Sequence, residues 1–386
     1  MPVSSAPASL SRSLSGSREV LLSVRDLRAY FHTDDGVVKA VDGLSFDVHR
    51  GEVFSIVGES GSGKSVTAMT IMGLLPDVTV ESGEILWRDR DLLSVSESDR
   101  RRVRGGEIAM IFQDPLTALN PVHTVGRQIG EMARVHEGLN KKQAIERAAE
   151  MLDLVGIPQA RKRVSMYPHE FSGGMRQRAM IAMAISCKPD LLIADEPTTA
   201  LDVTVQAQVL EVLLSIKDEI DSAIMLITHD LGVVAGLADS VMVMYAGRQV
   251  EMGTVDEIFY EARHPYSLGL LASLPRLTDE GDEPLVPIKG SPPSLIRRPS
   301  GCAFHPRCSF ARVPGLCDAE IPELRLVAGD NHRSACHYAE TLEDVTVSTL
   351  RDKLDDAELL GLELEARGDQ GPEVETEATT EREGKT

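Results

Sequence analysis

The sequence predicts an α/β fold built on a mostly parallel sheet, and two observations lead to this prediction. Between residues 53 and 260 the pattern of strand, loop and helix repeats. Within that region, short apolar runs rich in β-branched residues are typical of strands buried on both faces of a sheet. These runs are VFSIV, IAMIF, LLIAD, AIMLIT and VMVMY.

Changes in composition divide the 386 residues into five segments. Alternating apolar and polar positions over residues 20–57 predict a small antiparallel β-subdomain at the start of the folded core. A long helical stretch, roughly 124–160, predicts a separate helical lobe within about 114–175. The expected segments are a serine-rich disordered leader (1–19), the core (20–265), a helix and linker (266–301), a Cys-rich extension (302–340) and an acidic disordered tail (341–386).

Charge and hydropathy exclude several classes of protein. The net charge is −20, and residues 341–386 hold 14 acidic and 5 basic residues. Such an acidic chain is a poor candidate for binding nucleic acid. No run approaches eighteen consecutive apolar residues, so we expect no membrane span. The leader lacks the apolar core of a signal peptide, so we expect the chain to stay in the cytoplasm.

A phosphate-binding loop follows the first predicted strand. GESGSGKS, residues 58–65, fits G-x-x-x-x-G-K-S between a strand and a helical run over 65–75 that Pro76 stops. The glycines let backbone N–H groups face phosphate oxygens, Lys64 is expected to reach the β- and γ-phosphates, and Ser65 to ligate Mg²⁺. This pattern predicts the P-loop NTPase fold. The expected nucleotide-binding residues of the loop are Gly58, Glu59, Ser60, Gly61, Ser62, Gly63, Lys64 and Ser65.

Polar side chains follow three other predicted strands and complete a hydrolytic site. In LLIADEP, the strand delivers Asp195 and Glu196 to the sheet edge where ligands bind in such folds. We expect Asp195 to hold Mg²⁺ and Glu196 to orient and polarise the attacking water. Gln113 is expected to touch Mg²⁺ or that water, and His229 to lie near the γ-phosphate. The predicted catalytic residues are therefore Glu196, His229 and Gln113.

In this order, the motifs resemble those of the ATPase subunit of an ABC transporter over residues 20–265. GESGSGKS matches the family's Walker A loop, LLIADE its Walker B strand and FSGGM, residues 171–175, its signature. Gln113 matches the Q-loop, His229 the switch histidine, and Ala200-Leu201-Asp202 the D-loop. Met175 departs from the family, which usually has glutamine there. The resemblance implies ATP as substrate, with Mg²⁺.

The resemblance also implies a head-to-tail pair of cassettes that share their nucleotides. Ser172, Gly173 and Gly174 open a helix, and in the family this turn faces the γ-phosphate held by the partner's P-loop. Asp202 belongs to the same composite site. Adenine usually stacks on an aromatic ring before the first glycine turn, for which Phe31 is favoured over Tyr30.

Longer runs resemble one branch of the family, the oligopeptide/dipeptide importer ATPases. They are FQDPLTALNPVHTVGRQI, HEFSGGMRQRAMIAMAI, and HPYSLGLLASLP followed by GCAFHPRC. The resemblance, which now reaches about residue 340, implies two membrane-spanning permease subunits, a second homologous ATPase and an extracytoplasmic peptide-binding protein. It implies a peripheral position on the cytoplasmic face of the membrane. The alternatives are an importer of nickel or another solute, and an ABC ATPase without transport.

Four of the five cysteines cluster in the C-terminal extension. Cys302, Cys308, Cys317 and Cys336 follow a C-x₅-C-x₈-C-x₁₈-C pattern. In a cytoplasmic chain such a cluster indicates a metal site more than disulfides, and the spacing lacks the short pairs of zinc sites. The resemblance implies a four-iron cluster, with zinc as the alternative. Mixed ligation with His305, His332 or His337 stays open, as do four free thiols and a redox or metal module as the main function.

Overall fold

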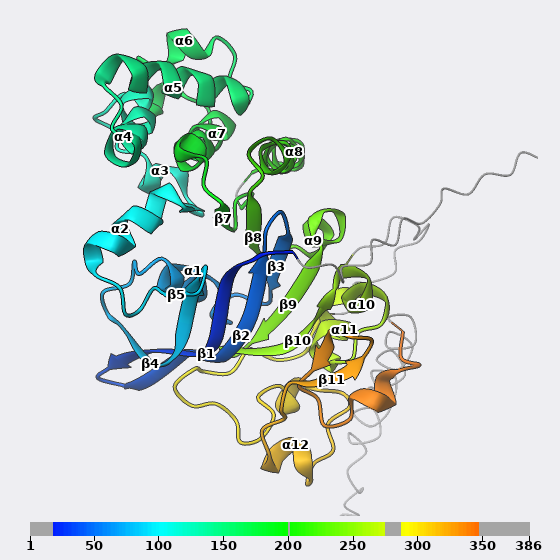
Figure 1. Cartoon of the computed structure of the whole chain (residues 1–386). Coiled ribbons are helices and arrows are strands. Elements are labelled where there is room, and N and C mark those ends of the chain that lie inside the picture. The colour runs from blue at the N-terminus through cyan, green and yellow to red at the C-terminus, as the bar shows by residue number, and fades with distance from the viewer. Residues whose placement is uncertain (1–17, 200, 275–286, 347–386) are drawn as a thin grey trace, which may run out of the picture.

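The computed structural model describes residues 18–199, 201–274 and 287–346, and within these residues the chain forms two sheets (Figure 1). One sheet has four antiparallel strands and the other has eight strands, five of them parallel. Ala200, residues 1–17 of the predicted leader, 275–286 of the predicted linker and 347–386 of the predicted tail lie outside the described residues.

The smaller sheet is antiparallel, as predicted; two of its strands lie within the predicted residues 20–57, and the other two lie within residues 78–91. Its order is β2-β1-β4-β5, and its strands are β1 (Val20–Thr33), β2 (Gly36–His49), β4 (Val78–Trp87) and β5 (Arg90–Asp91). Alternate residues are buried at the end of β2, over residues 42–49, as expected for a sheet that covers a core with one face, whereas residues 21–24 of β1 are buried without a break. Phe46 stacks on Phe54 with ring centroids 5.1 Å apart, which joins this sheet to the larger one.

The larger sheet contains all five predicted buried strands, which confirms the α/β fold. Its order is β11-β12-β10-β9-β3-β8-β7-β6. The parallel strands are β3 (Val53–Val57), β6 (Ile108–Ile111), β7 (Leu191–Asp195), β8 (Ala223–Thr228) and β9 (Ser240–Tyr245). Nearly all of their residues are buried, and their carboxyl ends meet along one edge.

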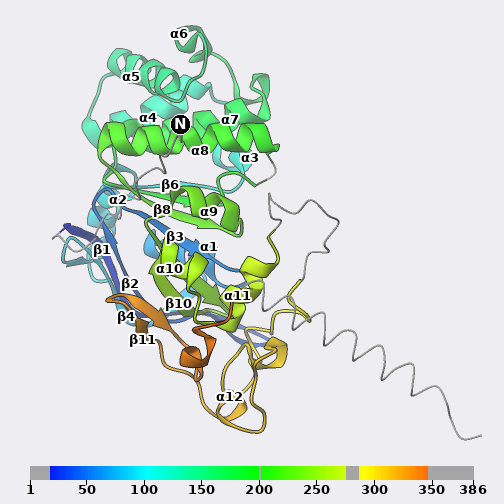
Figure 2. The same cartoon turned by 90° about the vertical axis from the view of Figure 1, so that its right-hand side faces the viewer.

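Two groups of helices surround this sheet. Those near the sheet are α1 (Lys64–Ile71), α2 (Glu97–Gly106), α8 (Val203–Ile220), α9 (Leu231–Leu237), α10 (Val255–Tyr260) and α11 (Pro265–Ala272). The others form a lobe beyond the β6 side of the sheet (Figures 1 and 2). They are α3 (Pro115–Ala118), α4 (Val125–Glu137), α5 (Lys141–Leu154), α6 (Ala160–Arg163) and α7 (Gly173–Ala184).

One predicted helix boundary is wrong, and a glycine is the reason. The helix after the phosphate loop ends at Ile71 rather than at Pro76, because Gly73 takes a φ of 62°. The helical stretch predicted over roughly 124–160 is present, and it consists mainly of the two helices α4 and α5. Gly138 ends α4 in the left-handed conformation, and a capping box at Asn140 starts α5.

The C-terminal extension is built onto the sheet rather than beside it. Its strands β11 (Arg325–Ala328) and β12 (His332–Ser334) continue the sheet from β10 (Arg248–Thr254), and α12 (Leu316–Ala319) lies farther out. Fully buried His332 contacts fully buried Glu251 at 2.9 Å between Nε2 and Oε1. The extension therefore shares its core with the cassette.

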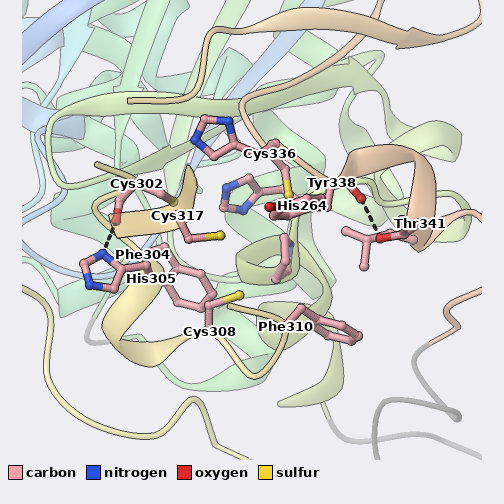
Figure 3. A pocket seen from close by; sticks show the side chains of 13 residues that line it. His264, Cys302, Phe304, His305, Cys308, Phe310, Cys317, Cys336, Tyr338 and Thr341 are labelled. Carbon is pink, nitrogen blue, oxygen red and sulfur yellow. Dashed lines mark hydrogen bonds between the residues drawn. The ribbon is translucent and has the colours of Figure 1, made fainter. Parts of the chain in front are cut away.

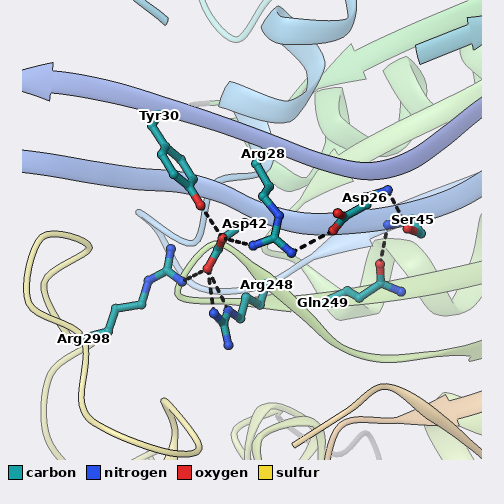
Figure 4. Close-up of polar contacts among 8 residues, drawn as sticks. All are labelled: Asp26, Arg28, Tyr30, Asp42, Ser45, Arg248, Gln249 and Arg298. Carbon is teal, nitrogen blue, oxygen red and sulfur yellow. Dashed lines mark hydrogen bonds and ion pairs between the residues drawn. The ribbon is translucent and has the colours of Figure 1, made fainter. Parts of the chain in front are cut away.

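A second link joins the segment before the extension to the antiparallel sheet. Buried Asp42 accepts hydrogen bonds from Tyr30, Arg28, Arg248 and Arg298, at 2.6–3.1 Å (Figure 4). Burial alone raises the pKa of Asp42, but these hydrogen bonds and the arginine charges outweigh it and hold the pKa well below its usual value. Arg298 thus ties its segment to the cassette.

Candidate active site

The phosphate loop lies between β3 and α1, and two of its glycines are required by the backbone. Gly58 has a φ of 152° and Gly63 a φ of 104°. A Cβ at either position would lie 2.2 Å from a backbone oxygen, that of Met244 or Ala40 respectively. No other residue fits these close approaches, so the loop can adopt this path only with glycine at both positions.

Lys64 is held inside the loop. Its side chain is buried, and Nζ donates to the carbonyl oxygens of Gly58 at 2.7 Å and Glu59 at 3.0 Å. Burial lowers the pKa of Lys64, and the carboxylates of Glu196, Asp195 and Glu59 oppose that shift. The ammonium therefore lies among acceptors and carboxylates, in a position suited to a polyphosphate.

Ser65 and Asp195 lie together at the start of α1 and the end of β7. The Ser65 hydroxyl donates to Asp195 Oδ1 at 2.9 Å. Burial raises the pKa of Asp195 above its ordinary value, and the Ser65 hydrogen bond opposes that shift. A hydroxyl and a carboxylate side by side are oxygen donors of the kind that Mg²⁺ prefers, so these two residues fit the ion.

The three predicted catalytic residues converge, although they come from three different strand ends. Gln113 Nε2 donates to Glu196 Oε2 at 3.1 Å, and His229 Nδ1 lies 3.3 Å from Glu196 Oε1. Glu196 has a φ of 47°, and its N–H donates to Ile227 O at 2.8 Å. A left-handed glutamate is strained and is maintained by the turn around it. The contacts with Gln113 and His229 hold the carboxylate between these two side chains.

The signature turn lies apart from the phosphate loop of its own chain. Ser172 caps α7 and its Oγ accepts from Met175 N–H at 3.3 Å, while Gly173 is exposed. Among the described residues no hydrogen bond joins residues 172–174 to residues 58–65. Asp202 caps α8 and accepts from Val205 N–H at 3.0 Å. The structure does not bring these four residues to the nucleotide loop of the same chain.

The two candidate aromatic rings for adenine differ in what they contact. The Tyr30 hydroxyl donates to Asp42 at 2.6 Å, so this ring serves the Asp42 cluster (Figure 4). Phe31, the next residue of β1, is half-buried, and its ring cannot form such a hydrogen bond. The assignment of the adenine to Phe31 stays a prediction.

The four clustered cysteines surround one cavity. It is lined by Cys302, Cys308, Cys317 and Cys336 together with His264, Phe304, His305 and His337. Figure 3 shows Cys308, Cys317 and Cys336 directed into the same space. Burial raises the pKa of Cys308 to about 12 and that of Cys336 to about 11. Among residues 18–199, 201–274 and 287–346, no group of three or more His, Cys, Asp or Glu side chains that could hold a single metal ion is found.

Three contacts of the site escaped the sequence analysis. Thr199 Oγ1 donates to Glu196 Oε2 at 2.9 Å, and its place in the turn after Asp195-Glu196 was the available signal. The Tyr266 hydroxyl accepts from the Glu59 N–H at 2.8 Å, and Arg307 forms an ion pair with the Glu59 carboxylate. No local pattern connects these distant positions with the loop.

Comparison with known proteins agrees with this geometry. Residues 41–199 match the family model described as ABC transporter, and residues 250–314 match the one described as oligopeptide/dipeptide transporter, C-terminal region. In the part of the chain that the structure describes, no helix has the length and apolar character to cross a membrane.

Three similar proteins illustrate the relationship. The dipeptide transport ATP-binding protein DppD of Bacillus subtilis is 53% identical over 320 residues, 82% of this chain and 94% of the relative. The oligopeptide transport ATP-binding protein OppD of Salmonella typhimurium is 55% identical over 292 residues, 76% of this chain and 87% of the relative. The solved structure of cbiO1 from Clostridium perfringens, part of an ABC transporter complex, is 29% identical with a TM-score of 0.54, covering 62% of this chain and 91% of cbiO1.

The geometry of the site and the comparisons lead to the same family. The site has a phosphate loop, an acidic strand end beside it and a cluster of glutamine, glutamate and histidine, and the similar ATP-binding proteins match over most of their length. The chain belongs to the family of ABC transporter ATP-binding subunits, within its oligopeptide/dipeptide group.

Proposed function

We propose that this ATPase energises the import of peptides across the cytoplasmic membrane. The observation that carries the proposal is the convergence of Lys64, the Ser65–Asp195 pair and the Gln113–Glu196–His229 cluster at one sheet edge. The similar proteins with oligopeptide or dipeptide transport in their names, and the matching C-terminal region, favour peptides as the solute.

The residues divide the work of hydrolysis as follows. The loop from Gly58 to Ser65 binds the phosphates of ATP, with Lys64 as the cation at the β- and γ-phosphates. Ser65, Asp195 and Gln113 would hold Mg²⁺, and the ion would neutralise charge on the phosphates. Glu196 orients and polarises the attacking water, while Gln113 and His229 hold its carboxylate from two sides. Phe31 supports the adenine.

The full assembly contains this chain, a homologous second ATPase, two membrane-spanning permease subunits and an extracytoplasmic peptide-binding protein. The two ATPases pair head to tail, so that Ser172, Gly173, Gly174 and Asp202 face the nucleotide of the partner. Exposed apolar side chains in the segment after Gln113 support a permease contact there, since Leu116 is 60% and Val122 is 71% exposed. The chain would thereby lie on the cytoplasmic face of the membrane. We propose the same five segments that the composition predicts, with boundaries at residues 19/20, 265/266, 301/302 and 340/341.

Replacing Lys64 tests the proposed function directly. Lys64→Ala removes the buried ammonium of the loop, so we expect at least a roughly tenfold weaker affinity for Mg·ATP. ATP-dependent peptide uptake by the reconstituted transporter should fall with it. Lys142→Ala removes an exposed lysine of α5 and serves as the control. Uptake that continues at the parent rate in the Lys64 variant contradicts the proposal.

We further propose that Cys302, Cys308, Cys317 and Cys336 hold a four-iron cluster, which would supply rigidity rather than electron transfer. The support is that all four thiols line one largely enclosed apolar cavity, which suits the donor set of such a cluster. Burial raises the pKa of Cys302, Cys308 and Cys336, so their protons must leave when a metal binds.

Loss of a single cysteine should remove the cluster. The parent chain, purified without oxygen, is expected to be brown and to absorb at about 400 nm. Cys308→Ser should abolish this absorbance and loosen the extension, while Mg·ATP still binds. Cys187→Ser changes a cysteine outside the cavity and should keep the colour. A colourless parent with stoichiometric zinc, or with no metal, rejects the iron cluster.

A further inference from the structure

The phosphate loop carries an acidic side chain, which is unexpected at a site for a polyanion. Glu59 is the second residue of the loop, directly after Gly58. Its carboxylate acts electrostatically on Lys64, the cation of the loop. A carboxylate close enough to act on Lys64 also repels phosphates bound there, because like charges repel each other strongly where water is partly excluded. The loop therefore needs a counter-charge for Glu59.

Arg307 of the C-terminal extension supplies that charge. Its guanidinium forms a bidentate pair with the Glu59 carboxylate, with Nη1–Oε2 at 2.6 Å and Nη2–Oε1 at 2.9 Å. Only 5% of the Arg307 side chain and 26% of the Glu59 side chain is exposed. Charge-assisted pairs of this geometry are strong and specific. The pair joins residues 248 positions apart in the chain.

Further contacts fix the guanidinium where it is. Its Nε donates to the Lys289 carbonyl at 3.0 Å, and Nη2 also reaches the Ile288 carbonyl at 3.4 Å. Nη1 lies 3.4 Å from the Tyr245 hydroxyl. Arg307 therefore cannot turn away from Glu59 without losing several hydrogen bonds in a buried place.

Glu59 is also the residue that connects Arg307 with Lys64, the lysine of the phosphate loop. Its carbonyl accepts from Lys64 Nζ at 3.0 Å, and its N–H donates to the Tyr266 hydroxyl at 2.8 Å. The chain of contacts runs from the extension through Arg307 and Glu59 to Lys64. Arg307 also directly precedes Cys308, one of the residues that line the cysteine-lined cavity.

We propose that Arg307 is a positioning residue of the nucleotide site, which neutralises Glu59 so that the phosphate loop accepts ATP. The C-terminal extension is then part of the ATP site rather than an accessory segment. This inference rests on the proposed function, because it assumes that the loop binds a nucleoside triphosphate.

Removal of the charge at position 307 should weaken ATP binding, and removal of the carboxylate should restore it. For the full chain titrated with Mg·ATP by calorimetry, Arg307→Gln should raise Kd about tenfold. The double variant Glu59→Gln/Arg307→Gln should return to within about threefold of the parent, because the repulsion is gone. Arg307→Lys keeps the charge and should bind close to the parent. Glu59→Gln alone should bind at least as tightly as the parent.

The double variant separates neutralisation from simple anchoring. If Arg307 only anchored the extension, the double variant would bind as weakly as Arg307→Gln, and that result overturns the proposal. Parent-like binding by Arg307→Gln, or weaker binding by Glu59→Gln alone, overturns it as well. Arg312→Ala removes another arginine of the extension, one that stacks on Tyr338, and should leave Kd unchanged. A failure of the proposed function is distinct, since the parent itself would then not bind Mg·ATP.

Discussion

Glu196→Gln is expected to lower ATP hydrolysis by about a hundredfold or more while Mg·ATP still binds. The amide has nearly the size of the carboxylate, so it can keep a contact with Gln113, which donates to Oε2 at 3.1 Å. It cannot accept a proton from water or polarise it as a carboxylate does. The phosphate cradle from Gly58 to Ser65 is untouched, so binding and chemistry should separate.

Steady-state phosphate release together with calorimetric ATP binding checks this expectation. A matched control is Glu211→Gln, which makes the same chemical change at an exposed position of α8. That variant should hydrolyse ATP like the parent. Hydrolysis by the Glu196 variant at close to the parent rate would mean that another group activates the water.

The parts of the site that lie on strand ends could be predicted from the sequence. Gln113, Asp195 and His229 each follow or end an apolar run that is too continuous for a half-exposed strand. Parallel strands place such positions at one edge, so the convergence of Gln113 and His229 on Glu196 follows from topology. The fold and the core of the site were therefore accessible before any coordinates.

Features that depend on backbone conformation or distant packing could not be predicted. Gly73 and Gly138 each lie within a helical pattern, and the pattern does not show that they take positive φ and end helices. The Arg307–Glu59 pair depends on how the extension packs against the sheet, and the local sequence pattern contains no information on that packing. The cavity lined by the four cysteines also depends on this packing, because the spacing of the cysteines in the sequence does not determine the distances between their side chains.

Gly173→Asp is expected to abolish ATP-dependent pairing of the two ATPase subunits while the affinity of the single subunit for Mg·ATP stays unchanged. A Cβ at Gly173 meets no atom within 4 Å, so the new side chain fits the fold. As the first residue of α7, an aspartate also interacts favourably with the helix dipole. In the proposed head-to-tail pair, its carboxylate would face the γ-phosphate held by the partner. Pairing can be followed by light scattering in the Glu196→Gln background, where ATP is consumed slowly.

The matched control for this variant is Gly173→Asn, which adds a side chain of the same size without the charge. If charge against the partner's phosphate decides the outcome, the asparagine variant still pairs at raised ATP concentration, whereas the aspartate variant does not. Loss of ATP affinity in the isolated subunit would show instead that Ser172 and Gly173 contact the nucleotide of their own chain. That result is hard to reconcile with the place of α7 in the lobe, since among the described residues no hydrogen bond joins residues 172–174 to the phosphate loop. In the proposed head-to-tail pair a second cassette would complete each site, which would account for the separation of the two turns within one chain.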